Sequence, residues 1–275
     1  MTEGIKTLKA SGGDYTDPQT WWDTECATYD CTTNATSPVL ECYNDWPTGL
    51  SQFVDMNQGV GYAADVNHHP IIRPASGEGH NGIPQSGFHL KVFRNYNTAV
   101  LVNADYALVD GIDAQNTASF GRAFDKSTNG QTATICNSIG KGGASVAAFN
   151  NLRGTFDRGN LAWGGWAGFA NQNWNAVTLR NCVAANCNRG FYVSSDGGGA
   201  TLKNCVAYNN TTNYVSAGAG WASSTNNAAS DGATNTPPGF NPLTTDVVSS
   251  DFVDAANDDY HLSATSQLIG DGANL

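Results

Sequence analysis

Residues 178–186, TLRNCVAAN, and residues 201–209, TLKNCVAYN, are nearly the same sequence, set 23 residues apart. Seven of the nine positions are identical, and Lys203 replaces Arg180. A period of this length, in a segment rich in Thr, Val and Leu, is typical of a solenoid whose coils stack as β-strands. We therefore predict an all-β fold, a right-handed parallel β-helix with coils of about 22–25 residues.

Fainter copies extend the repeat toward the N-terminus. Residues 133–140, ATICNSIG, and residues 107–112, ALVDGI, align with it, and Asp110 takes the place of the repeated Asn. Strands are thus expected to begin near residues 107, 134, 178 and 201, with an intervening coil between the second and third. Phe191 and Tyr214 are also 23 residues apart, which predicts a second strand in each coil.

The repeated residues predict two structural ladders along the solenoid. We expect Asn181 and Asn204 to be buried at equivalent turns, with their amides paired between coils. Cys182 is expected to stack over Cys205 inside the coil, where a small apolar sulfur fills a narrow core.

The prolines divide the chain into three regions. All nine lie at or before Pro84 or at or after Pro237, as expected where central strands need every backbone N–H group. We expect an N-terminal cap at 1–40, coils at 41–222, and a closing coil or extension at 223–275. Asp17 and Pro18 predict a short helix in the cap.

Composition and charge limit the partners. The net charge of −11 argues against nucleic acid and anionic membranes as partners. No apolar stretch is long enough to span a membrane, and the start, MTEGIK, lacks a signal peptide, so we expect synthesis in the host cytoplasm.

The seven cysteines do not form a metal-binding pattern, since no His lies between residues 90 and 260. The coil cysteines are expected to be buried thiols. The spacing of Cys26 and Cys31 is compatible with two alternatives, a local disulfide or two free thiols.

Four segments carry a resemblance to known proteins: SGGDYT followed by WW (11–22), ECYNDWPTGL (41–50), GHNGIPQSGF (79–88) and DDYHLSATSQLIGDGA (258–273). They resemble right-handed parallel β-helix proteins of tailed bacteriophages. The resemblance implies a non-catalytic virion structural protein on the particle surface, either a capsid decoration protein or a fibre or spike component. Two alternatives stay open, because the fold hosts many functions: a polysaccharide lyase or depolymerase of tailspike type, and a carbohydrate-binding adhesin.

The catalytic alternative has weak candidates in Asp110, Asp113 and Arg122, since a lyase of this fold needs a basic residue near clustered Asp ligands for calcium. Four acidic residues near the C-terminus could also bind Ca²⁺, but they lack the alternating pattern of a calcium loop: Asp251, Asp254, Asp258 and Asp259. We therefore expect no catalytic site, no metal and no cofactor, with Ca²⁺ as the open exception.

A dense, glycine-interleaved aromatic segment is the best candidate for binding a host-surface glycan or a partner protein. Its residues are Trp163, Trp166, Phe169 and Trp174. The alternative is a loop packed on its own solenoid. For assembly we expect a homo-oligomer, most simply a trimer, which uses residues 239–275 and attaches to other virion proteins.

Overall fold

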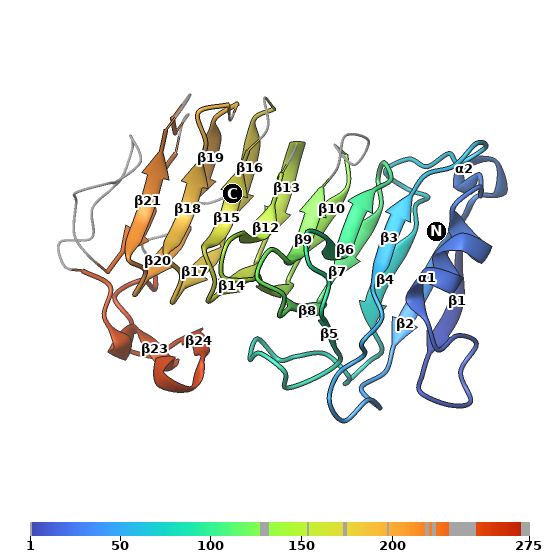
Figure 1. Cartoon of the computed structure of the whole chain (residues 1–275), viewed down its shortest axis with the longest axis horizontal. Coiled ribbons are helices and arrows are strands. Elements are labelled where there is room, and N and C mark those ends of the chain that lie inside the picture. Colours follow the sequence, from blue (N-terminus) through green and yellow to red (C-terminus); the bar gives the residue numbers. More distant parts are fainter. Residues whose placement is uncertain are drawn as a thin grey trace.

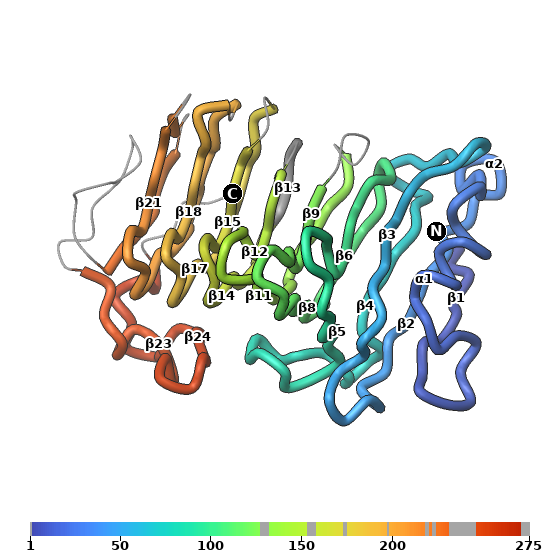
Figure 2. The backbone as a smooth tube through the Cα atoms, viewed as in Figure 1, coloured from blue at the N-terminus to red at the C-terminus, as the bar shows by residue number. Residues whose placement is uncertain are grey.

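The chain winds into a solenoid of three parallel sheets. The structure, a computed structural model, describes residues 2–126, 132–152, 154–172, 175–196, 198–217, 220–221, 224–230 and 246–270. Within these residues, the strands of each of the three large sheets pair in parallel, coil upon coil. Figure 1 shows the coils side by side along the long axis, and the tube in Figure 2 shows the winding. The prediction of an all-β parallel β-helix is confirmed.

Most coils contribute one strand to each of the three sheets. In spatial order, sheet 1 contains β1 (Thr2–Leu8), β2 (Thr36–Cys42), β4 (Ile71–Pro74), β7 (Leu108–Asp110), β10 (Thr134–Cys136), β13 (Gly154–Arg158), β16 (Val177–Arg180) and β19 (Ala200–Lys203). Sheet 2 contains β5 (His89–Val92), β8 (Asp113–Asn116), β11 (Ile139–Lys141), β14 (Leu161–Trp163), β17 (Val183–Ala185), β20 (Val206–Tyr208) and β22 (Ala228–Ala229). Sheet 3 contains β3 (Val54–Asn57), β6 (Thr98–Asn103), β9 (Arg122–Lys126), β12 (Ala147–Asn150), β15 (Ala167–Asn171), β18 (Arg189–Val193) and β21 (Thr212–Ser216).

The residues that repeat in the sequence lie opposite one another in the paired strands of the sheets. Thr178 lies opposite Thr201, and Arg180 opposite Lys203. β13 supplies the coil expected between β10 and β16. Phe191 lies opposite Tyr214, which confirms the second repeated strand.

The alignment of Asp110 is wrong by one residue. Asp110 lies opposite Cys136, and its neighbour Gly111, with a φ of 69°, takes the turn position that Asn137 occupies in the next coil. This turn requires left-handed backbone, which glycine adopts without strain and asparagine tolerates. Gly111 therefore occupies the turn position, and Asp110 is the last residue of β7.

The expected burial of the asparagine ladder is also wrong, although its turn positions are right. Asn181 is exposed and Asn204 is half-buried, and the Asn204 amide donates to the Asn181 side-chain oxygen at 3.2 Å on the surface. Both residues have left-handed backbone, with φ of 51° and 53°. The next residues, Cys182 and Cys205, turn into the core and are 0% exposed, as predicted.

Two other asparagines are buried at this corner, in the column of the cysteines. Asn160 accepts from the backbone N–H of Ser138 at 2.9 Å, and Asn227 accepts from that of Cys205 at 2.9 Å. Each also donates to a backbone carbonyl of the neighbouring coil. The amides thus satisfy backbone groups at the bend between sheets 1 and 2, which would otherwise be buried without partners.

Aromatic rings fill the core beneath sheet 3. They form a continuous stack with centroids 4.7–5.4 Å apart, made of Phe124, Phe149, Phe169, Phe191 and Tyr214. The opposite sheet faces this stack with alanines such as Ala162, Ala184 and Ala207, which are 0% exposed. Small residues on sheet 2 leave the space that the rings of sheet 3 fill.

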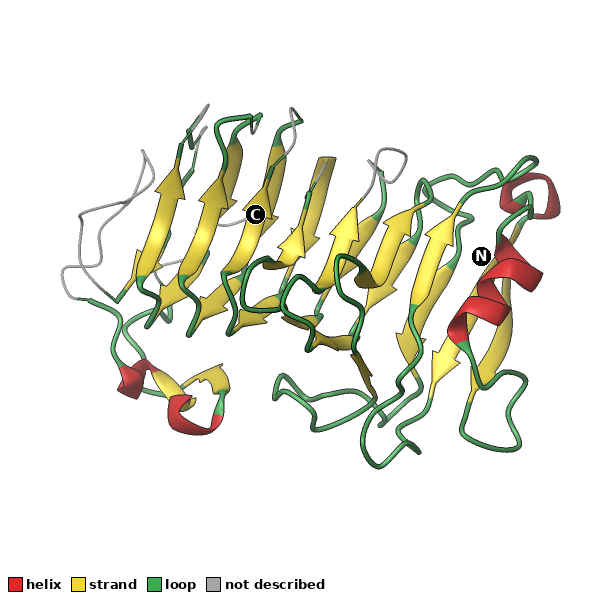
Figure 3. Cartoon of the chain, viewed as in Figure 1, coloured by secondary structure: helices red, strands yellow, loops and turns green. Residues whose placement is uncertain are grey.

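A helical segment covers the N-terminal end, and Figure 3 shows it beside the first strands. It consists of α1 (Pro18–Trp21) and the π-helical η1 (Trp22–Cys26), and Asp17 caps it as predicted; α2 (Cys31–Asn34) follows. The sheets begin before residue 41, where the sequence placed the first coil, because β1 pairs with β2 along its whole length. The cap is therefore an insertion between two strands of sheet 1.

The C-terminal segment, residues 246–270, folds back on the outer face of sheet 2. It contains η3 (Ser249–Asp251), η4 (Ala255–Asn257) and an antiparallel pair, β23 (Phe252–Asp254) and β24 (Asp259–Leu262). Phe252 packs on Tyr208 with centroids 4.9 Å apart, and the Asn186 amide donates to the Tyr260 hydroxyl at 2.6 Å. Phe240, also expected in this element, lies outside the described residues.

Candidate functional site

The corner where each coil passes from sheet 2 to sheet 3 carries the most exposed aromatic side chains of the described residues. Between β5 and β6, Phe93 is 77% exposed and Tyr96 is 71% exposed. In the following coil, between β8 and β9, Phe120 is 38% exposed. Exposed apolar surface of this kind marks interaction sites more often than it occurs by chance.

The coil register brings two of these rings together. Thr98 lies opposite Arg122, which places Tyr96 and Phe120 at equivalent turn positions. Their rings stack with centroids 4.6 Å apart and an interplanar angle of 10°. The stack ends there, because the exposed, small Ser145 lies at the corner of the following coil. One face of the Phe120 ring is thus left without an aromatic neighbour in the stack.

One coil beyond Ser145, Trp166 packs against Ala147 and Ala167 on the outer face of sheet 3. The Arg189 guanidinium lies over its ring, 4.5 Å from the centroid, and Tyr192 meets it edge to face at 5.2 Å. We call the surface formed by Phe93, Tyr96, Phe120 and Trp166 the aromatic ledge. Cation–π and edge contacts hold the Trp166 ring in place.

Trp163 lies on the outer face of sheet 2, where it packs against the apolar cluster that Phe252 and Tyr260 of the C-terminal segment complete. The Lys141 ammonium of the neighbouring strand sits 3.9 Å from the centroid of its ring. Its indole N–H is buried and has no hydrogen-bond partner among the described residues. Of the four predicted binding residues, Trp166 thus belongs to the ledge, whereas Trp163 is partly buried against the C-terminal segment's cluster.

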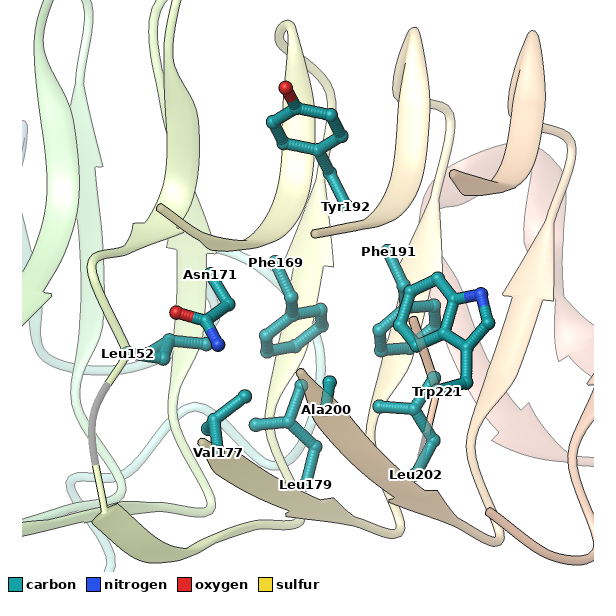
Figure 4. Close-up of a pocket in the computed structure, with 10 residues that line it drawn as sticks. All are labelled: Leu152, Phe169, Asn171, Val177, Leu179, Phe191, Tyr192, Ala200, Leu202 and Trp221. Atoms are coloured by element: carbon teal, nitrogen blue, oxygen red, sulfur yellow. The ribbon is translucent and has the colours of Figure 1, made fainter. Parts of the chain in front are cut away.

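The prediction for Phe169 is wrong. It is 1% exposed and belongs to the core stack, because β15 directs it inward. Figure 4 shows Phe169 and Phe191 pointing toward Leu179 and Leu202, whereas Tyr192 points the other way. The fourth predicted residue, Trp174, lies outside the described residues.

The space among these core side chains is not a ligand site. Its volume is about 10 Å³, and it is lined by apolar groups such as Phe169, Leu179 and Leu202. A cavity of this size holds at most one water molecule. This cavity therefore has no room for a ligand larger than a water molecule.

The three weak catalytic candidates do not form one group. Asp110 is on sheet 1, Asp113 on sheet 2 and Arg122 on sheet 3. Asp110 accepts from the Asn137 amide at 2.8 Å, and Arg122 pairs with Asp125 at 3.4 Å. Both therefore serve local contacts between or within coils.

Asp113 is the most perturbed of the three. It is 0% exposed, and burial raises the pKa of its carboxyl to about 6, although the backbone N–H of Gln85 donates to it at 2.6 Å. Its second oxygen and the side-chain amide N–H₂ of Gln115 are buried without a hydrogen bond of good geometry to any residue that the structure describes, although the nearby Gln115 amide lowers the pKa of the Asp113 carboxyl slightly. This carboxyl lies beneath the loop that precedes β5 and is closed to a polymer.

The remaining predictions on ligands concern cysteine and metal. All seven cysteines are buried free thiols, so Cys26 and Cys31 do not form a disulfide in this structure. In the described part of the chain, no three His, Cys, Asp or Glu side chains gather as a metal site would require. Among the same residues, no helix has the length and apolar character needed to cross a membrane.

Comparison with known proteins leaves the function open. No family model matches the chain, and no curated protein does. A similar solved structure is described as "Crystal structure of pectate lyase Pel9A"; it shares 13% identity with a TM-score of 0.47, over 100% of this chain and 93% of that chain. The fold assignment rests on the strand register itself, and the fold and the ledge together define a parallel β-solenoid with an exposed aromatic surface.

The sequence did not predict the aromatic ledge, because its residues do not belong to an identical sequence repeat. A usable signal was present, since Phe93, Tyr96 and Phe120 all lie in short turns between strands, where polar residues are expected.

Proposed function

We propose that the protein is a non-catalytic, glycan-binding β-solenoid that contacts sugar rings through the aromatic ledge. The observation that carries this is the stacked pair of Tyr96 and Phe120 beside the 77% exposed Phe93. Flat aromatic faces pack on the C–H face of a sugar ring, and each buried aromatic contact contributes about 1 kcal/mol beyond its area. A row of such rings along the coils fits an extended polysaccharide better than a compact ligand.

The ledge can be tested by substitution at its exposed positions. We expect Phe93→Ala and Phe120→Ala each to weaken glycan binding by about fivefold or more, as the loss of one such contact implies. Tyr96→Asn should do the same, since asparagine tolerates the φ of 59° found there. Calorimetry against glycans selected on an array measures the effect.

Val60→Ala provides the matched control, because Val60 is 96% exposed but lies away from the ledge. It should bind like the parent. The proposal fails if the parent binds no glycan on a broad array, or if the three ledge variants bind as it does.

Display on a bacteriophage particle, contact with other virion proteins and a trimeric state stay predictions. A glycan-binding solenoid suits a particle surface, because many copies multiply weak contacts. Location of the protein in purified particles by labelled antibody would test the display.

We also expect no cleavage of the bound polymer, because Asp110, Asp113 and Arg122 lie on three different sheets. Incubation with capsule, lipopolysaccharide and pectin-like polymers should release neither reducing ends nor unsaturated products. Release that disappears in Asp110→Asn or Arg122→Ala would contradict this expectation.

A further inference from the structure

The turns between sheets 2 and 3 change length halfway along the solenoid. The three that follow β5, β8 and β11 have five residues each, and the three that follow β14, β17 and β20 have three residues each. The strands on both sides of this change stay in register, since Ile139 lies opposite Leu161 and Ala147 opposite Ala167. The two additional residues of each longer turn therefore project outward from the corner. The long turns are residues 93–97, 117–121 and 142–146.

The third long turn has a serine where the first two have aromatic rings. The register of β9 and β12 places Ser145 opposite Phe120, just as the register of β6 and β9 places Phe120 opposite Tyr96. The Ser145 backbone N–H donates to the Ser119 carbonyl at 2.9 Å, so the third turn lies directly against the second. Ser145 is exposed. Its small side chain leaves the next position of the aromatic stack empty of a ring.

This position has the thickness of one ring. The centroids of Tyr96 and Phe120 are 4.6 Å apart, which is close to the spacing of about 4.8 Å between neighbouring strands. Each coil therefore gives room for one stacked ring. Among the described residues, Tyr96 is the one ring that stacks on Phe120, and Trp166 of the following coil packs onto sheet 3 instead. We call the space over Ser145, beside the free face of Phe120, the open ring position.

The charges around the open ring position favour an uncharged ligand. None of the three long turns contains Asp or Glu, and their one cation, Arg94, pairs with Asp55 at 3.1 Å. Lys141, directly before the third turn, lies over the Trp163 ring, and Arg122 is paired within β9. These cations are thus already engaged, and the net charge of −11 disfavours an anionic ligand at long range.

We infer that the open ring position binds one neutral sugar ring, which takes the place of the missing third ring of the stack. A six-membered sugar ring with equatorial hydroxyls, as in glucose, presents a flat face of C–H groups that packs on an aromatic face. The Ser145 hydroxyl can donate to or accept from a hydroxyl at the edge of that ring. The inference rests on the proposed function, because it places one ring of the glycan that the aromatic ledge contacts.

Filling the open ring position with a side chain tests the inference on the full chain. The Ser145→Phe ring should stack on Phe120 and raise the melting temperature by about 2 °C or more, as a new aromatic pair implies. The same ring should exclude the sugar. Calorimetry with cellohexaose and laminarihexaose, two neutral oligomers of glucose, should therefore show at least one that binds the parent and binds Ser145→Phe about fivefold or more weakly.

Two controls separate the filled position from an added ring in general. Ser145→Ala leaves the position open and should bind like the parent. Thr211→Phe adds the same ring at an exposed residue of a short turn and should also bind like the parent. The inference is overturned if Ser145→Phe gives no rise in melting temperature, if it binds like the parent, or if either control loses as much affinity.

The outcomes also distinguish this inference from the proposed function. A parent that binds neither glucose oligomer, or that binds polygalacturonate more tightly than both, overturns the inference, whereas the proposed function fails only by the array and the ledge variants. If Phe93→Ala weakens binding of a glucose oligomer and Ser145→Phe does not, the aromatic ledge binds the glycan but the open ring position takes no part.

Discussion

At the corner between sheets 1 and 2, a residue with left-handed backbone determines which side chain after it enters the core. Asn181 and Asn204 have this conformation, and the cysteine after each is turned inward. The sequence predicted the inward cysteines, because a repeated apolar residue after Asn is visible as a pattern. It did not predict that the asparagines lie on the surface, since amide ladders can form on either side of a coil wall. Nor could it distinguish Asp110 from Gly111 without knowing which position needs a positive φ.

Cys182→Asp places a charge without a partner in the narrow core, and we expect a loss of about 4 kcal/mol or failure to fold. Asn181→Asp adds the same charge one residue earlier, on the surface, where the backbone suits aspartate. That control should stay within about 0.5 kcal/mol of the parent. Urea unfolding measures both, and equal stability of the two variants would mean that the register of this coil is wrong.

Asp113 should make stability depend on pH in the direction opposite to most carboxylates. Its pKa is raised from 3.8 to about 6 by burial, so the folded state holds the proton more tightly than the unfolded state. The contribution to stability is present below about pH 4 and is lost as the pH rises through about 6. Asp113→Asn should therefore stabilise the protein at pH 7, by as much as about 3 kcal/mol, and less at pH 4. Melting curves of parent and variant across this range would contradict the shift if their difference did not change with pH.

At the scale of the elements, side chains of the cap make hydrogen bonds to the edge strand β3 that a further strand would otherwise make. The Gln19 amide oxygen of α1 accepts from the Asp55 backbone N–H at 2.6 Å, and its nitrogen donates to the Asp55 carbonyl at 3.3 Å. Trp22 donates to the Asn57 carbonyl at 2.9 Å, two residues further along β3. The free edge of sheet 3 is thus satisfied and hidden. Asp17 and Pro18 predicted the helix, but not its partner, because that contact joins residues far apart in the sequence.

We expect Gln19→Ala to destabilise the protein by about 1–3 kcal/mol, since it leaves backbone groups of β3 without partners. Gln52→Ala, an exposed glutamine near the same strand, is the control and should cost less than about 0.5 kcal/mol. Hydrogen exchange at Asp55 gives a local readout, and an unchanged exchange rate there would contradict the role assigned to Gln19.

At the scale of the molecule, the repeat in the sequence covers only the later coils. Insertions lengthen the earlier coils. One of them is the segment between β4 and β5, in which the Nε2 atom of His80 lies 2.8 Å from the Asn137 carbonyl oxygen. The C-terminal fold-back had no periodic signal, because its contacts are with the outside of sheet 2. Val247, Phe252 and Tyr260 are buried there in the chain's own structure, so deleting the segment would expose sheet 2 and confuse a test of self-association.

The predicted trimer is better tested through residues that the fold-back leaves outside. Val253 is 60% exposed and Ile269 is 57% exposed, and both lie on the C-terminal segment. If this segment joins the subunits, light scattering should give a trimeric mass at micromolar concentration, and Val253→Asp with Ile269→Asp should reduce it to the 28.9 kDa of one chain. Val60→Asp, at a residue that is 96% exposed and near the N-terminal end, should leave the trimer intact. A monomeric parent removes self-association altogether, whereas a trimer that survives the C-terminal substitutions moves the contact to another face of the solenoid.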